Sequence, residues 1–99
     1  FMSVGAEGVI SVASNVIPRE VSHMVDYFRS GRPDAALKLH AKFYPLFKDL
    51  FIETNPIPVK AALAMLGQVE EHYRLPLVPM SAKNRAVLKQ TMQACGVLK

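Results

Sequence analysis

The 99-residue sequence predicts a mostly helical chain with one buried β-strand, which is typical of part of an α/β protein rather than of a complete domain. Three observations predict this class. A short β-branched run lies near the N-terminus, and four segments with helical periodicity follow it. Hydrophobic residues make up 51% of the chain, which is too many for a disordered tail.

The strand is predicted at residues 8–12, where Val9, Ile10 and Val12 are β-branched. Two adjacent apolar residues indicate a strand that is covered on both faces, as in parallel sheets. A single buried strand leaves its N–H and C=O groups without partners. We therefore expect the chain to be a fragment whose strand pairs with a part of the protein that lies outside it. Phe1 before Met2 also suggests a cut or partial start.

The first two helices are predicted at residues 18–30 and at about 33–52. Pro18 fits a first helical turn, and Gly31 is a helix stop. Apolar residues recur at helical spacing in the first helix: Val21, Met24, Val25 and Phe28. The stripe of the second helix consists of Leu39, Phe43, Leu46 and Leu50. Pro45 interrupts this stripe and should kink the helix.

Two shorter helices are predicted after these. The third spans about 57–66, with Asn55 as its cap and Gly67 as its stop. Residues 70–79 read as an extended connection. Ser81 is the expected cap of a last helix that ends at Gly96. The inward residues of this helix are expected to be Val87, Leu88, Met92 and Cys95.

Composition excludes several function classes. The net charge is +4, but the twelve Lys and Arg residues are scattered, so no nucleic-acid partner is expected. No apolar run approaches the ~18 residues that span a membrane, and no signal peptide is visible. The single cysteine, Cys95, permits no internal disulfide, which fits a reducing cytoplasm. We expect Cys95 to be a buried thiol.

Three stretches, taken in order along the chain, resemble a known family. They are residues 8–15, residues 53–60, and residues 74–81 read together with the tail 96–98. Their order and spacing are similar to the C-terminal part of the dihydrodipicolinate synthase family. The resemblance implies a (β/α)8 TIM-barrel parent. Residues 1–31 would then end the barrel, with its last strand at 8–12 and its last helix at 18–30, and residues 32–99 would form a C-terminal domain of three helices.

The resemblance also implies a function for the parent protein. Family members are lyases that condense pyruvate with aspartate semialdehyde, in lysine and diaminopimelate biosynthesis, through a Schiff base on a lysine. That lysine and the proton-relay residues lie upstream of this chain, so we expect no catalytic residue, no metal and no cofactor here. The isolated piece should be inactive. Its expected partners are the missing N-terminal part of the barrel and further copies of itself, since the family is commonly a tetramer.

One residue of the chain matches a position of the family's substrate pocket. Ile10 corresponds to the residue that lines the pyruvate pocket beside the Schiff base, whereas packing alone would make it core filler. Lys60 lies in the first turns of a helix without a cationic neighbour, so we expect a structural role. The three histidines, His23, His40 and His72, lack metal-ligand spacing.

Two alternatives remain open on the sequence. The parent could be another pyruvate-dependent aldolase of the same superfamily, such as an N-acetylneuraminate lyase-like enzyme. The chain could also be a non-catalytic helical module that binds a partner through its Phe-rich helix, where Phe43, Phe47 and Phe51 are otherwise expected in packing. The adjacent acids Glu70 and Glu71 are expected to form a solvated loop edge.

Overall fold

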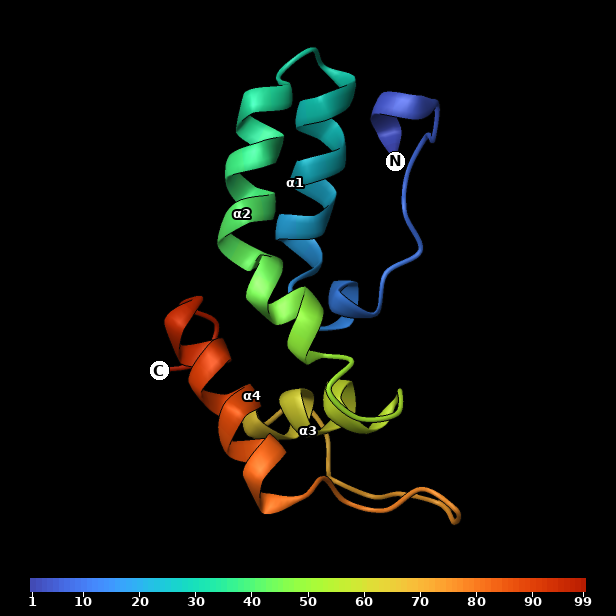
Figure 1. Cartoon of the computed structure of the whole chain (residues 1–99), viewed down its shortest axis with the longest axis vertical. Helices are drawn as coiled ribbons and strands as arrows, with labels where there is room; N and C mark the ends of the chain where they lie inside the picture. Colours follow the sequence, from blue (N-terminus) through green and yellow to red (C-terminus); the bar gives the residue numbers. More distant parts are fainter.

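Four α-helices carry the fold of the computed structural model, which describes residues 1–99 (Figure 1). They are α1 (Pro18–Arg29), α2 (Pro33–Asp49), α3 (Ile57–Met65) and α4 (Ala82–Ala94). Two short 3-10 helices, Met2–Val4 and Val12–Asn15, precede them. None of the four α-helices combines the length and the apolar composition that crossing a bilayer requires.

The helices α1 and α2 form an antiparallel hairpin (Figure 1). Gly31 closes the turn between them with φ of +77°, a conformation that costs glycine little. The amide of Arg32 donates to the carbonyl of Tyr27 at 2.8 Å, which satisfies one of the free carbonyls at the end of α1. Pro45 lies inside α2, and Figure 1 shows the helix axis bending in its second half, as predicted.

The helix α4 packs against α2 and α3 at the other end of the molecule, and the loop of residues 68–80 projects from it (Figure 1). The cap predicted at Ser81 is confirmed, because its Oγ accepts a hydrogen bond from the amide of Asn84 at 3.3 Å. The cap predicted at Asn55 is wrong. The helix α3 begins at Ile57, whose amide donates instead to the carbonyl of Thr54 at 2.9 Å.

The hydrophobic core lies where the hairpin meets α3 and α4. Only 16 of the 99 residues are buried, and none of them is polar or charged, so the core is small for a chain of this length. Its fifteen hydrophobic members are Ala13, Val16, Ile17, Val21, Phe43, Leu46, Leu50, Ile57, Val59, Ala61, Ala62, Met80, Leu88, Met92 and Cys95. The predicted end of the barrel and the predicted helical domain therefore share one core in this chain.

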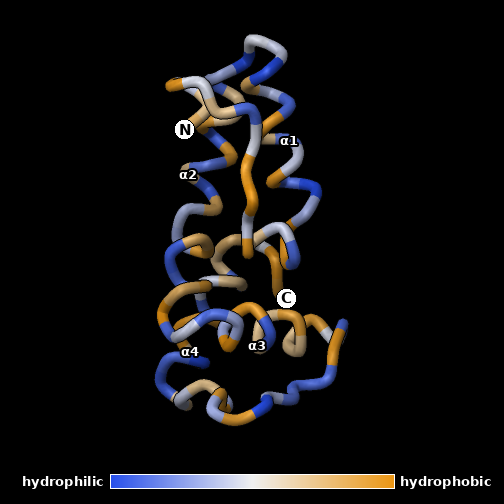
Figure 2. Tube along the Cα trace, turned by 90° about the vertical axis from the view of Figure 1, so that its right-hand side faces the viewer, coloured by the Kyte–Doolittle hydropathy of each residue, from blue (hydrophilic) through white to orange (hydrophobic).

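Much of the apolar surface of the chain lies outside this core. Figure 2 shows apolar residues along the N-terminal segment and along the hairpin helices. In α1 only Val21 of the four predicted inward residues is buried, and Met24, Val25 and Phe28 remain partly exposed. The inward face of α1 was therefore predicted correctly, but within this chain only the first turn of that face is buried.

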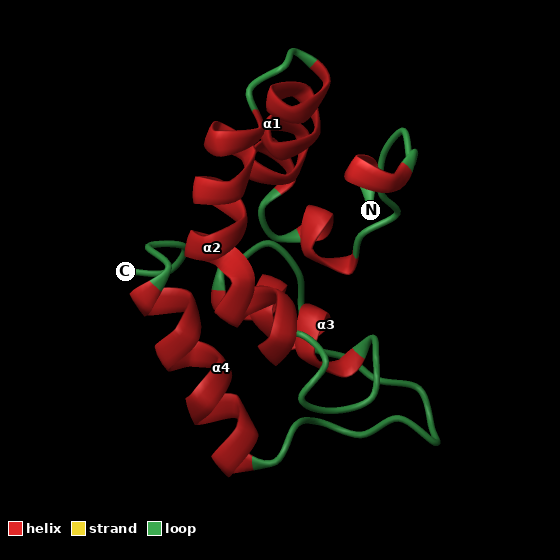
Figure 3. Ribbon diagram, turned by 45° about the horizontal axis from the view of Figure 1, so that its top comes forward, coloured by secondary structure: helices red, strands yellow, loops and turns green.

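The prediction of a strand at residues 8–12 needs correction. Residues 6–11 have no regular secondary structure, and Val12 belongs to the 3-10 helix Val12–Asn15, so the chain contains no strand (Figure 3). The physical reason is the absence of a partner strand, which the sequence already indicated. A β-strand is defined by hydrogen bonds to a neighbouring strand, and this chain offers none.

Candidate functional site

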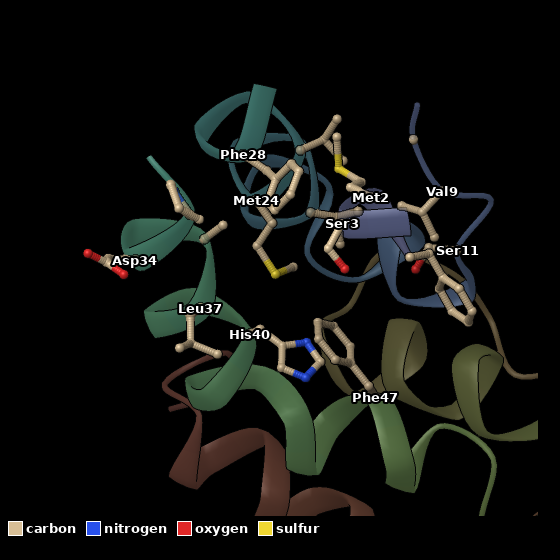
Figure 4. A pocket seen from close by; sticks show the side chains of 16 residues that line it. Met2, Ser3, Val9, Ser11, Met24, Phe28, Asp34, Leu37, His40 and Phe47 are labelled. Carbon is tan, nitrogen blue, oxygen red and sulfur yellow. The ribbon is translucent and has the colours of Figure 1, made fainter. Parts of the chain in front are cut away.

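An open cleft lies between the N-terminal segment and the helical hairpin (Figure 4). Its volume is about 560 Å³, and ten of its sixteen lining residues are hydrophobic. Met24 and Phe28 reach into it from α1, and Leu37, His40 and Phe47 line it from α2 (Figure 4). A few polar residues also line it, among them Ser3, Ser11 and Asp34. The lining of the cleft is thus mostly apolar.

Three of the residues 8–11 line this cleft. Gly8, Val9 and Ser11 line it, whereas Ile10 does not. Val9 is 59% exposed and Ile10 is fully exposed, at 106% of its reference area. Successive side chains of an extended segment point to opposite sides. The alternation therefore places Val9 on the side of α1 and α2 and leaves Ile10 on the opposite side.

The turn that follows Ile10 is held in place by hydrogen bonds. The Ser14 hydroxyl donates to the carbonyl of Ser11 at 2.5 Å, and the side-chain amide of Asn15 donates to the carbonyl of Val12 at 3.1 Å. Ala13, in the middle of this turn, is buried in the core. The C-terminal end of the segment that carries Ile10 is consequently fixed to the core, although the rest of the segment has no such support.

The contacts of Lys60 connect parts of the fold. Its Nζ donates to the carbonyl of His72 at 2.5 Å and lies 5.7 Å from the centre of the Tyr73 ring. These contacts join the start of α3 to the loop that precedes α4. No arrangement of three or more His, Cys, Asp or Glu side chains in the structure could hold a metal ion.

A polar cluster between that loop and α4 was missed at the level of sequence. Two oxygens of Glu71 accept hydrogen bonds from Arg85 at 2.7 and 2.6 Å, and one of them also accepts from the Tyr73 hydroxyl at 2.9 Å. The prediction of a solvated edge is therefore wrong for Glu71, while Glu70 is exposed as expected. Arg85 follows Glu71 by fourteen residues, across a loop, so no local spacing could have revealed the pair.

The cluster shifts the pKa of two of its members. Burial acts to raise the pKa of the Glu71 carboxyl, but the hydrogen bonds from Arg85 and Tyr73 and the charge of Arg85 outweigh it and lower that pKa below 4.5. Burial, followed by the hydrogen bond to Glu71, raises the pKa of the Tyr73 phenol to about 12. Tyr73 therefore keeps its proton at neutral pH and donates a hydrogen bond to the Glu71 carboxylate.

Glu53 ties the connection after α2 to the start of α4. It accepts hydrogen bonds from the amide and hydroxyl of Ser81, each at 3.0 Å, and from the side chain of Asn84 at 2.8 Å. The hydrogen bond from Asn84 is the largest cause of a lowered pKa of the Glu53 carboxyl, and burial opposes it. At neutral pH this carboxylate is charged next to a helix N-terminus, where the helix dipole favours it.

The buried thiol predicted at Cys95 is confirmed. Burial raises its pKa, and its Sγ lies 3.5 Å from the carbonyl oxygen of Lys42. Of the three phenylalanines that were predicted in the second helix, Phe43 is buried and Phe47 lines the cleft, whereas Phe51 lies beyond the end of α2 and is 59% exposed.

We expect the stability of the chain to fall as the pH drops below 4.5. The folded state holds the pKa of Glu71 below that ordinary value, so the unfolded chain takes up the proton first. The stabilisation is full above pH 4.5 and is lost as the pH falls through the folded value, by about 1 kcal/mol for a partly exposed ion pair. Urea midpoints between pH 7 and pH 3 measure it. The loss should be smaller in Glu71→Gln; an equal loss in that variant would contradict the assignment.

Comparison with known proteins identifies the relatives of this sequence. The model of the dihydrodipicolinate synthetase family matches residues 1–95. The chain is 46% identical over 97 residues to the 4-hydroxy-tetrahydrodipicolinate synthase of Thermosipho africanus, covering 98% of this chain and 33% of that protein. The synthase of Chlorobium phaeobacteroides is 50% identical over 98 residues, with coverage of 99% and 33%. The chain thus spans about a third of the length of these relatives.

Solved structures agree with this match. The synthase of Methylacidiphilum fumariolicum SolV superposes with a TM-score of 0.95 at 52% identity, over 97% of this chain and 32% of that one. The Thermotoga maritima enzyme gives a TM-score of 0.95 at 44% identity, over 98% and 33%. A chloride-inhibited synthase from Acinetobacter baumannii in complex with pyruvate gives 0.93 at 35% identity, over 98% and 33%. These proteins are TIM barrels, and the matched region is their C-terminal part.

Proposed function

Because the chain belongs to the dihydrodipicolinate synthetase family, we propose that it completes the barrel of a lyase that condenses pyruvate with aspartate semialdehyde. The observation that carries the proposal is the superposition on the Methylacidiphilum synthase over 97% of this chain, with a TM-score of 0.95. The relative in complex with pyruvate supports pyruvate as one substrate. The product would serve the biosynthesis of lysine and diaminopimelate.

In this proposal the chain supplies structure and one wall of the pocket rather than the reacting groups. The amine of a lysine outside the chain attacks the keto carbon of pyruvate, water leaves, and an imine links the two. Active sites of TIM barrels lie at the C-terminal ends of the strands. Residues 8–11 would be the last strand, pinned at its C-terminal end by the turn at residues 12–15, with Ile10 directed toward the barrel interior.

Lys60 does not take the place of the missing lysine. Its Nζ donates a hydrogen bond to the His72 carbonyl at 2.5 Å and lies over the Tyr73 ring, so it is already engaged within the chain. A Schiff-base lysine must instead present its nitrogen to the substrate in the neutral form. The 99-residue chain should therefore form no adduct when it is treated with pyruvate and borohydride, which reduces an imine to a stable amine.

A covalent chimera tests the proposal. The C-terminal third of the Methylacidiphilum synthase is replaced by this chain, joined at the start of the matched region. The expected result is a folded protein that is labelled by pyruvate and borohydride on its own lysine and that consumes aspartate semialdehyde. The unaltered synthase is the positive control, and the synthase without its C-terminal third is the negative one. A folded chimera that remains unlabelled would overturn the proposal.

A further inference from the structure

The turn after Ile10 contains a carbonyl that accepts two hydrogen bonds from one residue. The Ser11 carbonyl accepts from the amide of Ser14 at 3.3 Å and from the Ser14 hydroxyl at 2.5 Å. The N–H···O distance is longer than usual, whereas the O–H···O distance is at the short end of its range. The Ser14 hydroxyl is therefore the stronger of the two restraints on the peptide group that joins Ser11 to Val12.

This peptide group lies where the extended segment changes into the 3-10 helix. Ser11 has φ of −130° and ψ of 127°, which is extended backbone, and Val12 begins the 3-10 helix Val12–Asn15. Peptide groups are planar, so only two dihedral angles per residue are free. A fixed orientation of the Ser11 carbonyl consequently limits the course of the backbone at Ile10, the residue directly before it.

The 3-10 helix is itself attached to the core by hydrogen bonds within the chain. The carbonyl of Ala13 accepts from the amides of Val16 at 3.0 Å and Ile17 at 2.9 Å, and all three residues are buried. The 3-10 helix also contacts α1 and α3. A continuous series of contacts thus leads from the core through Ser14 to the backbone beside Ile10.

We propose that Ser14 is a positioning residue for pyruvate, and that it acts through Ile10. This inference rests on the proposed function, in which Ile10 lines the pyruvate pocket. Ser14 does not act on the substrate itself, because its hydroxyl proton is already donated to the Ser11 carbonyl. The hydrogen bond holds the end of the segment so that the Ile10 side chain keeps its place beside pyruvate. A small displacement of such a pocket wall weakens substrate binding.

Steady-state kinetics of the covalent chimera test this role. Ser14→Ala removes the hydroxyl and should raise the KM for pyruvate about fivefold, less than loss of the Ile10 side chain, because the wall is displaced and not removed. Ser14→Thr keeps a hydroxyl and should restore the KM. Ser30→Ala is the matched control, since the Ser30 hydroxyl also donates to a carbonyl three residues earlier, that of Tyr27 at 3.1 Å, but at the far end of α1. It should leave the KM unchanged.

A double-mutant cycle separates positioning from a general loss of stability. If Ser14 acts through Ile10, Ser14→Ala should raise the KM for pyruvate in the unsubstituted chimera and hardly change it once Ile10 has been replaced by alanine. A general loss of stability would instead affect both backgrounds alike. An unchanged KM in Ser14→Ala, or equal fold-changes in the two backgrounds, overturns the inference.

The 99-residue chain provides a second measurement that needs no activity. Loss of the Ser14 hydroxyl should move the NMR resonance of the Ser11 carbonyl carbon upfield in Ser14→Ala but not in Ser14→Thr, because only the first variant lacks the donor. A labelled, active chimera combined with an unchanged resonance or an unchanged KM removes this inference and leaves the proposed function intact. An unsubstituted chimera that pyruvate and borohydride do not label removes the proposed function, and this inference with it.

Discussion

Replacing Leu46 by alanine is expected to lower the free energy of unfolding of this chain by about 3 kcal/mol, within the range for fully buried leucines. Leu46 is 0% exposed and lies where α2 crosses the other core elements. The loss combines the transfer free energy of the removed atoms with the cavity that they leave. Because the core contains only 16 buried residues, few neighbours can relax into that space.

Chemical denaturation measures this effect. For a domain of this size the urea midpoint should fall by roughly 1–3 M, given a typical dependence of about 1–3 kcal/mol per molar urea. Leu37→Ala is the matched control, since Leu37 belongs to the same helix but is 63% exposed, and it should change the midpoint little. Equal losses in the two variants would show that the core described here does not hold the chain together.

The helices could be predicted from the sequence because their signals are local. Pro18, Gly31 and Ser81 lie within a residue or two of helix ends, and the spacing of Phe43, Leu46 and Leu50 identified the buried face of α2. The end of α2 was placed three residues too late, at 52 rather than at Asp49, because Leu50 and Ile52 extend the apolar pattern beyond the last helical turn.

The interactions that could not be predicted from the sequence join groups that lie far apart in the chain. The pair of Glu71 and Arg85 forms only after the loop before α4 has folded back. The segment at residues 8–12 shows the opposite problem. Its β-branched pattern is typical of a strand, but a strand forms only beside neighbouring strands, and this chain contains none. The strand prediction therefore failed because the neighbouring strands are absent from this chain, and not because the local pattern was misread.

Substitution of Ile10 is the sharpest test of the candidate site, because the two interpretations of this residue predict different outcomes. In the 99-residue chain its side chain is fully exposed, so Ile10→Ala should leave the urea midpoint unchanged. In the covalent chimera the same change should lower kcat/KM for pyruvate about tenfold, since apolar contacts in a pocket contribute roughly 1–3 kcal/mol to discrimination. Ile10→Asp should lower it at least a hundredfold, because its carboxylate would face that of pyruvate.

Comparing the thermal midpoint with the KM for pyruvate shows whether Ile10 lines the pocket or only fills the core. If Ile10 only fills the barrel interior, Ile10→Ala should lower the thermal midpoint of the chimera and leave the KM for pyruvate unchanged. If it lines the pocket, the KM rises while the midpoint changes less. Val9→Ala in the same chimera is the matched control, since Val9 lies on the opposite side of the segment and faces the cleft beside the hairpin helices. It should cost stability without changing the KM, so that the alternation seen in this segment becomes a measurable difference between two adjacent residues.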